Sequence, residues 1–252
     1  MKLSRLLAGV GLLMLVGTGC TTHAGAAAQV GSQTIGTSQL RGIVDRGLKA
    51  AQTVPIPQTS QSASQSLNRG ELQRRTLTTL VQLELISGEA KRLGISLTGQ
   101  DIASYYQAYA ILQFGSVKAF EQRAAAAGFA QQDVATIVRS GAFESALGDK
   151  ISPGVLASDA DTRAQYDSIV DQIGKIPLSY RQAKPYLARF LVADKRATKV
   201  RPLLAQAESR DPISINPRFG TWDTKQFAVV AAEGSIASKP APTPILDLTT
   251  RS

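Results

Sequence analysis

The stretch from Leu67 to Gly94 reads as one long helix, and the rest of the chain has to be arranged around it. It contains no proline, and Leu, Gln, Glu, Arg and Lys, which favour helices, supply most of its residues. Gly94 closely follows Lys91 and Arg92, an order that is typical of a helix C-terminus. At about 1.5 Å per residue, such a helix is about 40 Å long.

The apolar residues of this helix fall on two nearly opposite sides instead of forming one stripe. At about 100° per residue, one side holds Leu77, Leu80, Val81 and Leu85. The other side holds Leu72, Leu83, Ile86, Ala90 and Leu93. A helix that is apolar on two sides must be covered on two sides. The sequence therefore predicts a central helix with the rest of the chain packed around it.

The N-terminal residues have the pattern of a signal peptide. Lys2 and Arg5 form a basic region, and residues 6–16 form an apolar run that is too short for a transmembrane helix of about 20 residues. The small residues that follow end directly in Cys20 and resemble a bacterial lipobox, although an aliphatic residue is commoner than Gly17 at its position. Cys20 is the only cysteine, which favours lipidation of Cys20. The alternative is an ordinary signal peptide in which this cysteine has no role.

The composition suits a globular exported protein of one domain, or at most two. The chain has 252 residues, of which 43% are hydrophobic. Removing Lys2 and Arg5 from the 28 basic residues leaves 26 against 19 acidic residues, a net charge of +7. Export and the lack of a dense Lys/Arg block argue against nucleic acid as a partner. Attraction to anionic lipid or to an acidic envelope fits the charge, and so does a solvated surface kept for solubility.

Short elements are expected before the central helix. Residues 29–36 are predicted to form a hairpin, because apolar residues flank the turn-type pair Gly31-Ser32. Thr37-Ser38 can cap a helix that runs from Gln39 to about Ala50. Residues 52–66 hold two prolines, many Ser and Gln, and no charge, which favours a mobile loop.

Further helices follow, each with its own start signal. Thr98-x-x-Asp101 and Ser158-x-x-Asp161 resemble capping boxes. Ser116 can cap a short helix that is ended by Gly128. Residues 131–148 have the apolar periodicity of another helix. A last long helical region spans Ser179 to Ser209, with Pro185 near its start and Pro202 expected to kink or split it.

A late strand is predicted from Ile213 in the sequence ISINPRFGTWD. Because an isolated hairpin is only marginally stable, we expect this strand to join the hairpin and bring the chain ends together. Trp222 should then be partly buried against the hairpin or the central helix. The predicted fold class is mainly α: one long central helix and a small β-hairpin joined by a C-terminal strand. The predicted divisions are a signal peptide at 1–19, a tether at 20–28, a domain at 29–230 and a disordered tail at 231–252.

The order of these elements resembles the SurA-like and PrsA-like family of exported foldases. The segments that carry the resemblance are AAQVGSQTIGTSQL, LELISGEAKRLGISLTGQDI, ASDADTRAQYDSI and ISINPRFGTWD, within residues 28–223. Active members have a parvulin domain of about 100 residues, with active-site histidines, after the helix that ASDADTRAQYDSI resembles. Only about thirty residues, 149–179, are available here, and His23 is the only histidine. The resemblance therefore implies the non-catalytic chaperone domain without the prolyl isomerase.

The side chains exclude several kinds of catalytic site. The one histidine, His23, lies in the predicted flexible tether, which rules out a Ser-His-Asp triad, and a single histidine rules out any multi-histidine metal site. No phosphate-binding glycine loop is present, so we predict no cofactor, no metal and no enzyme activity. Asp159 and Asp161 are explained by helix capping better than by a paired-carboxylate site. Tyr105 and Tyr109 are candidates for a client-binding surface; the alternative places Tyr106 in the core and leaves the other two half-buried.

Two functions stay open on this basis. The first is a membrane-anchored extracytoplasmic chaperone, or holdase, that binds unfolded or newly exported polypeptides and is held to the membrane by its N-terminal lipid. The second is a structural or interaction lipoprotein with one dedicated envelope partner. A holdase suppresses aggregation of unrelated substrates, whereas a dedicated binder co-purifies with a single protein. An enzyme of unrecognised type is a third, weaker hypothesis, and the sequence predicts no oligomeric state.

Overall fold

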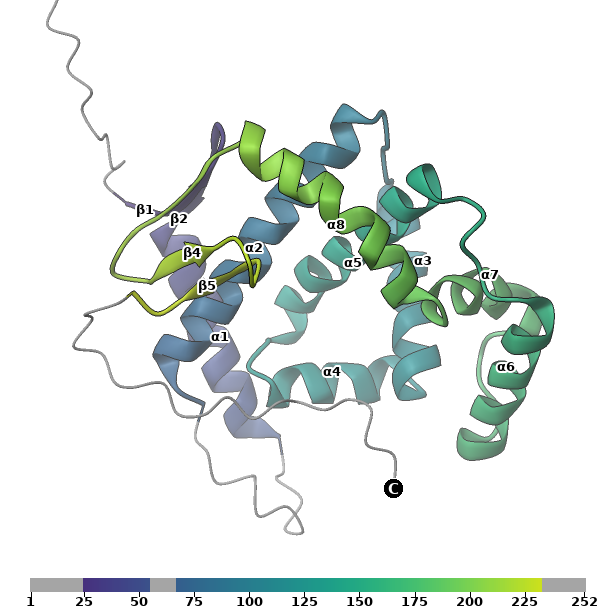
Figure 1. Cartoon of the computed structure of the whole chain (residues 1–252). Helices are drawn as coiled ribbons and strands as arrows, with labels where there is room; N and C mark the ends of the chain where they lie inside the picture. The colour runs from purple at the N-terminus through teal and green to yellow at the C-terminus, as the bar shows by residue number, and fades with distance from the viewer. Residues whose placement is uncertain (1–24, 55–66, 233–252) are drawn as a thin grey trace, which may run out of the picture.

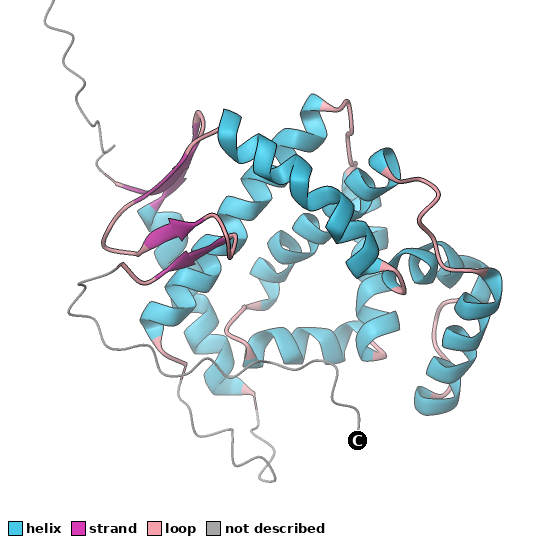
Figure 2. Cartoon of the chain, viewed as in Figure 1, coloured by secondary structure: helices cyan, strands magenta, loops and turns pink. Residues whose placement is uncertain are grey.

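The computed structural model describes residues 25–54 and 67–232, which form eight helices and five short strands (Figures 1 and 2). The mainly helical fold class predicted from the sequence is confirmed. The helices are α1 (Thr37–Thr53), α2 (Arg69–Arg92), α3 (Gly99–Phe114), α4 (Val117–Ala126), α5 (Gln131–Ile151), α6 (Asp159–Ile173), α7 (Tyr180–Phe190) and α8 (Ala193–Arg210). The strands are β1 (Ala26–Val30), β2 (Gln33–Gly36), β3 (Ile213–Ile215), β4 (Thr221–Asp223) and β5 (Ala228–Val230). None of the described helices is long and apolar enough to cross a membrane.

The long central helix is α2, and its C-terminal end forms as the sequence predicts. The Asn68 side chain caps its N-terminus by accepting hydrogen bonds from two backbone N–H groups of the first turn. At the other end Gly94 has φ +73°. Its N–H bonds to the Lys91 carbonyl at 3.0 Å, and the Ile95 N–H bonds to the Ala90 carbonyl at 2.8 Å. This pair of bonds is a Schellman motif, which requires the left-handed conformation that glycine adopts readily.

Both apolar sides of α2 are covered by other elements. The helix packs on α1, α5, α8, β1 and β5. On one side, a core forms with the hairpin, α1 and the C-terminal strands, and its α2 members are Leu72, Leu77, Leu80, Val81 and Leu85. On the other side, a second core forms with α5 and α8; it contains Leu83, Ile86, Ala90, Phe143, Leu147, Val200 and Leu204. The predicted central position of this helix is thus confirmed.

One residue of α2 packs on the side opposite to the prediction. Leu72 lies in the core of the hairpin and α1, not in the core of α5 and α8. The reason is the close approach of α1 to the turn after α4 at this end of the helix. A Cβ placed on Gly47 would lie 1.9 Å from the Gly128 carbonyl oxygen, and a Cβ on Gly128 would lie 2.9 Å from Leu72 Cδ1. The two elements meet over Leu72 and enclose it on the first side.

The hairpin and the late strand form one three-stranded sheet in the order β2-β1-β3. The strands β1 and β2 are antiparallel around the turn at Gly31-Ser32. Strand β3 pairs antiparallel with the other edge of β1, and this register places Val30 opposite Ile213 and Ala28 opposite Ile215. The prediction that the late strand joins the hairpin is confirmed.

A second sheet of two strands, which the sequence analysis does not predict, follows β3. Strands β4 and β5 are antiparallel, with Trp222 opposite Val229. The Trp222 ring is partly buried against the core of the hairpin and α1, and it meets the Phe227 ring edge-on at a centroid distance of 5.2 Å. Its Nε1–H donates to the Glu208 carboxylate of α8 at 2.9 Å. The predicted partial burial of Trp222 is confirmed, with α8 as an additional partner.

Three boundaries differ from the sequence-based expectation. Strand β1 begins at Ala26, inside the predicted tether, because the small side chains of Ala27 and Ala28 are buried and let β1 lie close to α2. Helix α1 starts at Thr37, with Gly36 as an N-cap that has no side-chain bond, because β2 continues to Gly36 and leaves no free residue for the Thr37-Ser38 cap. Helix α1 also extends to Thr53, into the predicted loop.

The last helical region divides at a different place from the one predicted. Pro202 lies inside α8, and the chain breaks between α7 and α8 at Leu191 and Val192. The predicted caps at Thr98, Ser116 and Ser158 are all present. The predicted signal peptide with Cys20, the rest of the loop at 52–66 and the tail from residue 233 lie outside the described residues.

Candidate functional site

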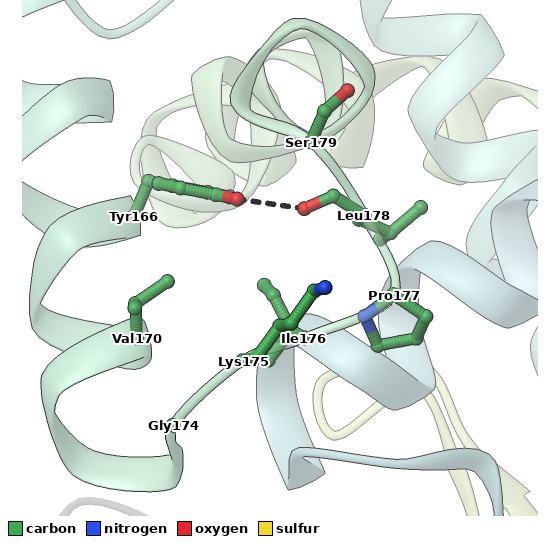
Figure 3. A pocket seen from close by; sticks show the side chains of 8 residues that line it. All are labelled: Tyr166, Val170, Gly174, Lys175, Ile176, Pro177, Leu178 and Ser179. Atoms are coloured by element: carbon green, nitrogen blue, oxygen red, sulfur yellow. Dashed lines mark hydrogen bonds between the residues drawn. The ribbon is translucent and has the colours of Figure 1, made fainter.

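A cavity lies between α6 and the segment, residues 174–179, that joins α6 to α7 (Figure 3). Its volume is about 540 Å³, within the range of sites that hold small molecules or side chains of a peptide. Figure 3 shows Tyr166 and Val170 on α6 facing this segment, with the Tyr166 hydroxyl donating to the Leu178 carbonyl oxygen at 2.7 Å. The lining residues are Tyr166, Val170, Gly174, Lys175, Ile176, Pro177, Leu178 and Ser179.

Local sequence signals position both walls of this cavity. Ser158 caps the N-terminus of α6, and Gly174 ends it at φ +86°, a conformation that glycine adopts without strain. A capping box between Ser179 and Gln182 starts α7. Between them, Ile176 is buried with residues of α3 and α7 and fixes the connecting segment in place. The cavity therefore has a defined shape and does not lie in an unanchored loop.

The chemistry of the lining suits apolar groups. Most of its side chains are apolar, and its one charged residue, Lys175, is exposed. No carboxylate, histidine or cysteine lines it, so the cavity holds no group suited to proton transfer or metal binding at neutral pH. Ile173, on the last turn of α6, is half exposed beside Gly174. The arrangement can accept an apolar side chain of an extended polypeptide, with Ile173 as added apolar surface.

The cavity lies at the edge of the molecule, where other exposed apolar side chains also occur. Helix α6 packs mainly on α7, which in turn packs on α3 and α8, and both lie far from the sheets (Figure 1). The large apolar side chains that are most exposed among the described residues are Ile151, Leu156, Ile173 and Leu191. All four belong to α5, α6, the loop between them or the α7–α8 junction.

The two tyrosines proposed from the sequence as client-binding residues lie elsewhere, on α3. The rings of Tyr105 and Tyr109 are nearly parallel, 6.2 Å apart, and each meets Phe190 edge-on. Tyr109 also packs edge-on against Phe120 at 5.4 Å. Burial raises the pKa of both tyrosine hydroxyls above the usual value of 10.0. These partly buried rings are engaged with one another, so their role in client binding stays a prediction without support from their exposure.

Tyr105 lines a second, smaller cavity of about 230 Å³ between α3, α5 and the α7–α8 junction. Glu144 also lines it, and burial raises the pKa of its carboxyl group. The buried Arg196 donates to Asp149 at 2.7 Å, and Arg189 binds the same carboxylate. Because charged groups dominate one side, this cavity fits an unfolded apolar segment less well than the cavity of α6 and α7 does.

The carboxylate pair at Asp159 and Asp161 has a structural role. The Asp161 N–H donates to the Ser158 hydroxyl at 3.1 Å, as helix capping predicts. Asp159 forms an ion pair with Lys184 at 2.6 Å and so ties α6 to α7. Within residues 25–54 and 67–232, no cluster of three or more His, Cys, Asp or Glu residues is placed to hold a metal ion.

Sequence reasoning missed the cavity of α6 and α7. It assigned no role to the six residues between the two helices, 174–179, because so short a segment carries no periodicity. A signal was nevertheless present: Ile176, Pro177 and Leu178 are three consecutive apolar residues in a segment that a polar loop would normally occupy.

Comparison with known families finds a match for the N-terminal part of the chain. Residues 3–147, more than half of the chain, match the family described as the SurA-like N-terminal domain. The matched range includes the hairpin, the central helix and α3 to most of α5. No curated protein matches the chain significantly.

Proposed function

The chain belongs to the family of SurA-like N-terminal domains, and from that membership we propose that it is an extracytoplasmic holdase. In this function it binds unfolded, newly exported polypeptides and performs no covalent chemistry. The proposed function includes a lack of prolyl isomerase activity. Its support is that residues 149–179, where the resemblance would place a parvulin domain, contain only the end of α5, α6 and the connections on either side of α6. Its family relation supports a chaperone-type role that acts on polypeptides.

The observation that carries the proposal is the open apolar cavity between α6 and residues 174–179. Unfolded chains expose apolar side chains that a folded protein would bury, and removing such a side chain from water contributes about 1.5–3 kcal/mol. A cavity with apolar walls and no fixed pattern of polar groups selects for apolarity and little else. Such weak selectivity suits a protein that meets many clients.

We further propose that Cys20 carries a diacylglyceryl group and holds the protein at the outer face of the cell membrane. The support is the sequence pattern that precedes this cysteine. One acyl chain binds a membrane only marginally, whereas two or three hold a protein firmly. Mass spectrometry of the mature protein tests this: a lipidated N-terminal Cys20 is expected, and Cys20→Ser should release the protein or leave it unprocessed. A mature N-terminus beyond Cys20 would exclude the anchor.

The holdase function is tested by aggregation suppression with two unrelated unfolded substrates. Wild type should suppress the aggregation of both, and the combined variant Val170→Ser with Leu178→Ser should lose most of this effect. Both side chains are only half-buried, so the fold should persist, which circular dichroism can check. Leu156→Ser is the matched control, because it removes an exposed leucine that lies outside the cavity.

Each outcome of this assay assigns or rejects the function. Equal loss in the cavity variant and in the control would show that the cavity is not the client site. If wild type protects neither substrate and co-purifies with a single envelope protein, the dedicated lipoprotein is the correct hypothesis. The same preparation should leave the rate of X-Pro isomerisation in a peptide unchanged, since this step has a barrier of about 18–20 kcal/mol that only a catalytic site lowers.

A further inference from the structure

The positive charge of the described residues is concentrated in two consecutive helices. Helices α7 and α8 together contain eight basic and two acidic residues, a net charge of +6. All the other described residues together contain 16 basic and 15 acidic residues, a net charge of +1. A surface kept charged only for solubility has no reason to gather its excess in one region, so this distribution points to an anionic partner.

Half of these basic residues are used to hold the fold together. Lys184 pairs with Asp159, Arg189 and Arg196 share Asp149, and Arg210 pairs with Glu89. The other four are exposed and form no ion pair with any described residue: Arg181, Lys195, Lys199 and Arg201. Three of these four lie on α8.

The geometry of α8 turns these three side chains outward. The helix buries one stripe against α2 and α5, made of Arg196, Val200, Leu204 and Ala207. Its opposite side faces away from the body, and α8 runs across the outside of the molecule (Figure 1). Small exposed residues lie between the basic ones on this side, Thr198, Pro202 and Ala205. Long basic side chains beside small residues can all reach a flat surface at once.

The two acidic residues of α8 do not cancel this charge. Glu208 accepts a hydrogen bond from the Trp222 indole, so it faces the β4–β5 sheet. Asp194 is exposed in the first turn and offsets one of the three unpaired cations. The outward side of α8, defined by Lys195, Lys199 and Arg201, therefore stays basic, and we call it the basic face of α8.

We propose that the basic face of α8 binds the anionic phospholipid headgroups of the membrane to which Cys20 is attached. The inference rests on the proposed lipid anchor. Four residues lie between Cys20 and Gly25, and the five residue steps from one to the other span at most about 17 Å, so the described domain must stay close to the membrane surface. Strand β1 then leads from Gly25 to Gly31, whose N–H bonds to the Pro212 carbonyl, two residues after α8 ends. The anchor thus enters the fold at Gly25, at the other end of β1, about 20 Å from the segment that follows α8. This distance keeps α8 within reach of the same membrane surface.

This contact would fix which side of the anchored domain faces the lipid. Each basic residue near an anionic membrane strengthens binding by about fivefold, and the effect extends over about one Debye length. A lipid anchor alone leaves the domain free to turn. With α8 against the headgroups, the domain has one preferred orientation.

Vesicle co-sedimentation tests the proposal with the chain from Cys20 onward, carrying Cys20→Ser so that no acyl group contributes. Wild type should bind vesicles that contain phosphatidylglycerol, should bind pure phosphatidylcholine vesicles far less, and should dissociate as salt is raised. The combined variant Lys195→Gln, Lys199→Gln and Arg201→Gln should bind the anionic vesicles at least tenfold more weakly. The matched control is Arg41→Gln, Lys49→Gln and Lys118→Gln, which removes three exposed basic residues of α1 and α4 and should change binding by less than about twofold.

Three results would overturn the proposal: no binding of wild type to anionic vesicles, equal weakening in the two triple variants, or tighter binding of the basic face to a soluble acidic polysaccharide than to the vesicles. The holdase proposal is tested by a separate measurement, the suppression of aggregation. The α8 variant should suppress aggregation as well as wild type does, so loss of vesicle binding with intact suppression concerns the membrane contact alone.

Discussion

Among single residues, Glu89 carries the most demanding electrostatic role. It is 2% exposed near the end of α2, and two arginines neutralise it. Arg92, one turn later, donates two hydrogen bonds to its carboxylate at 2.9 and 2.6 Å. Arg210, in the last turn of α8, binds the same carboxylate. Both arginines are partly exposed to water, whereas the Glu89 side chain is buried. Loss of the ion pairs would therefore destabilise the protein mainly by leaving a buried carboxylate without a counter-charge.

A double-mutant cycle should reveal this shared role. Arg92→Met or Arg210→Met alone should lower the free energy of unfolding modestly, because the other arginine still neutralises Glu89. The two substitutions together should cost more than their sum by about 1–3 kcal/mol, since they leave a buried, unpaired carboxylate. Urea unfolding measures the three variants. Adding Glu89→Gln to the double variant should recover part of the loss, and strictly additive costs would show that Glu89 does not depend on both partners.

At the scale of the element, α8 is a helix that continues through a proline. Pro202 lies in its interior and is exposed. Proline cannot donate a backbone hydrogen bond, and its ring crowds the carbonyl four residues earlier. The helix persists because Val200, Leu204 and Ala207 bury its inner stripe against α2 and α5. Tertiary packing here outweighs a local preference against helix.

Pro202→Ala should therefore stabilise the protein. The alanine restores one backbone hydrogen bond and removes the crowding, and no buried contact is lost because position 202 is exposed. After allowance for the greater freedom of the unfolded chain, the free energy of unfolding should rise by about 1–2 kcal/mol. Thermal unfolding followed by circular dichroism measures the gain. Pro153→Ala, in the exposed turn after α5, is the control and should give no gain; a lower midpoint for Pro202→Ala would mean that the proline fits this helix without strain.

The elements that the sequence predicts well are those decided by neighbouring residues. Thr98 with Asp101 and Ser116 cap their helices, and Gly94 ends α2, because each interaction lies within one turn. The features that it predicts poorly depend on distant partners. Leu72 changes side because α1 and the α4–α5 turn meet over it, and α7 separates from α8 at Leu191, where no proline marks a break.

The candidate site illustrates the same limit. The two helices around the cavity follow from their caps, but the depth of the cavity depends on Ile176, which is held by α3 and α7. Periodicity carries no information about a segment of this length. Tyr105 and Tyr109 are predicted from the sequence to form an accessible aromatic surface. The sequence cannot show that Phe190 and Phe120, which are distant in the chain or on another helix, pack against these rings.

At the scale of the whole molecule, the C-terminal strands close a fold that the N-terminal hairpin opens. Strand β3 pairs with β1 across more than 180 residues of sequence. Phe219, in the turn before β4, and Val229, in β5, are 6% and 5% exposed and lie in the core of the hairpin and α2. Two bonds from the strands reach α2 directly: the Val229 N–H donates to Thr78 Oγ1 at 2.8 Å, and Gln82 Nε2 donates to the Phe227 carbonyl at 2.8 Å.

Removing residues 213–252 should therefore destabilise the whole domain. The loss of Phe219 and Val229 exposes the apolar side of α2, at about 1.5–3 kcal/mol for each buried side chain, and β1 loses its partner and becomes an exposed edge that invites aggregation. This is a large share of the roughly 5–15 kcal/mol that stabilise a domain. The thermal midpoint should fall by about 10 °C or more, at about 2–4 °C per kcal/mol for a domain of this size, whereas a chain ending at Gly234 keeps every described residue and should unfold as wild type does. If the strands pack on α2 as described, their removal must destabilise α2 as well. An unchanged midpoint after the longer truncation would therefore mean that the sheets do not unfold cooperatively with the helices.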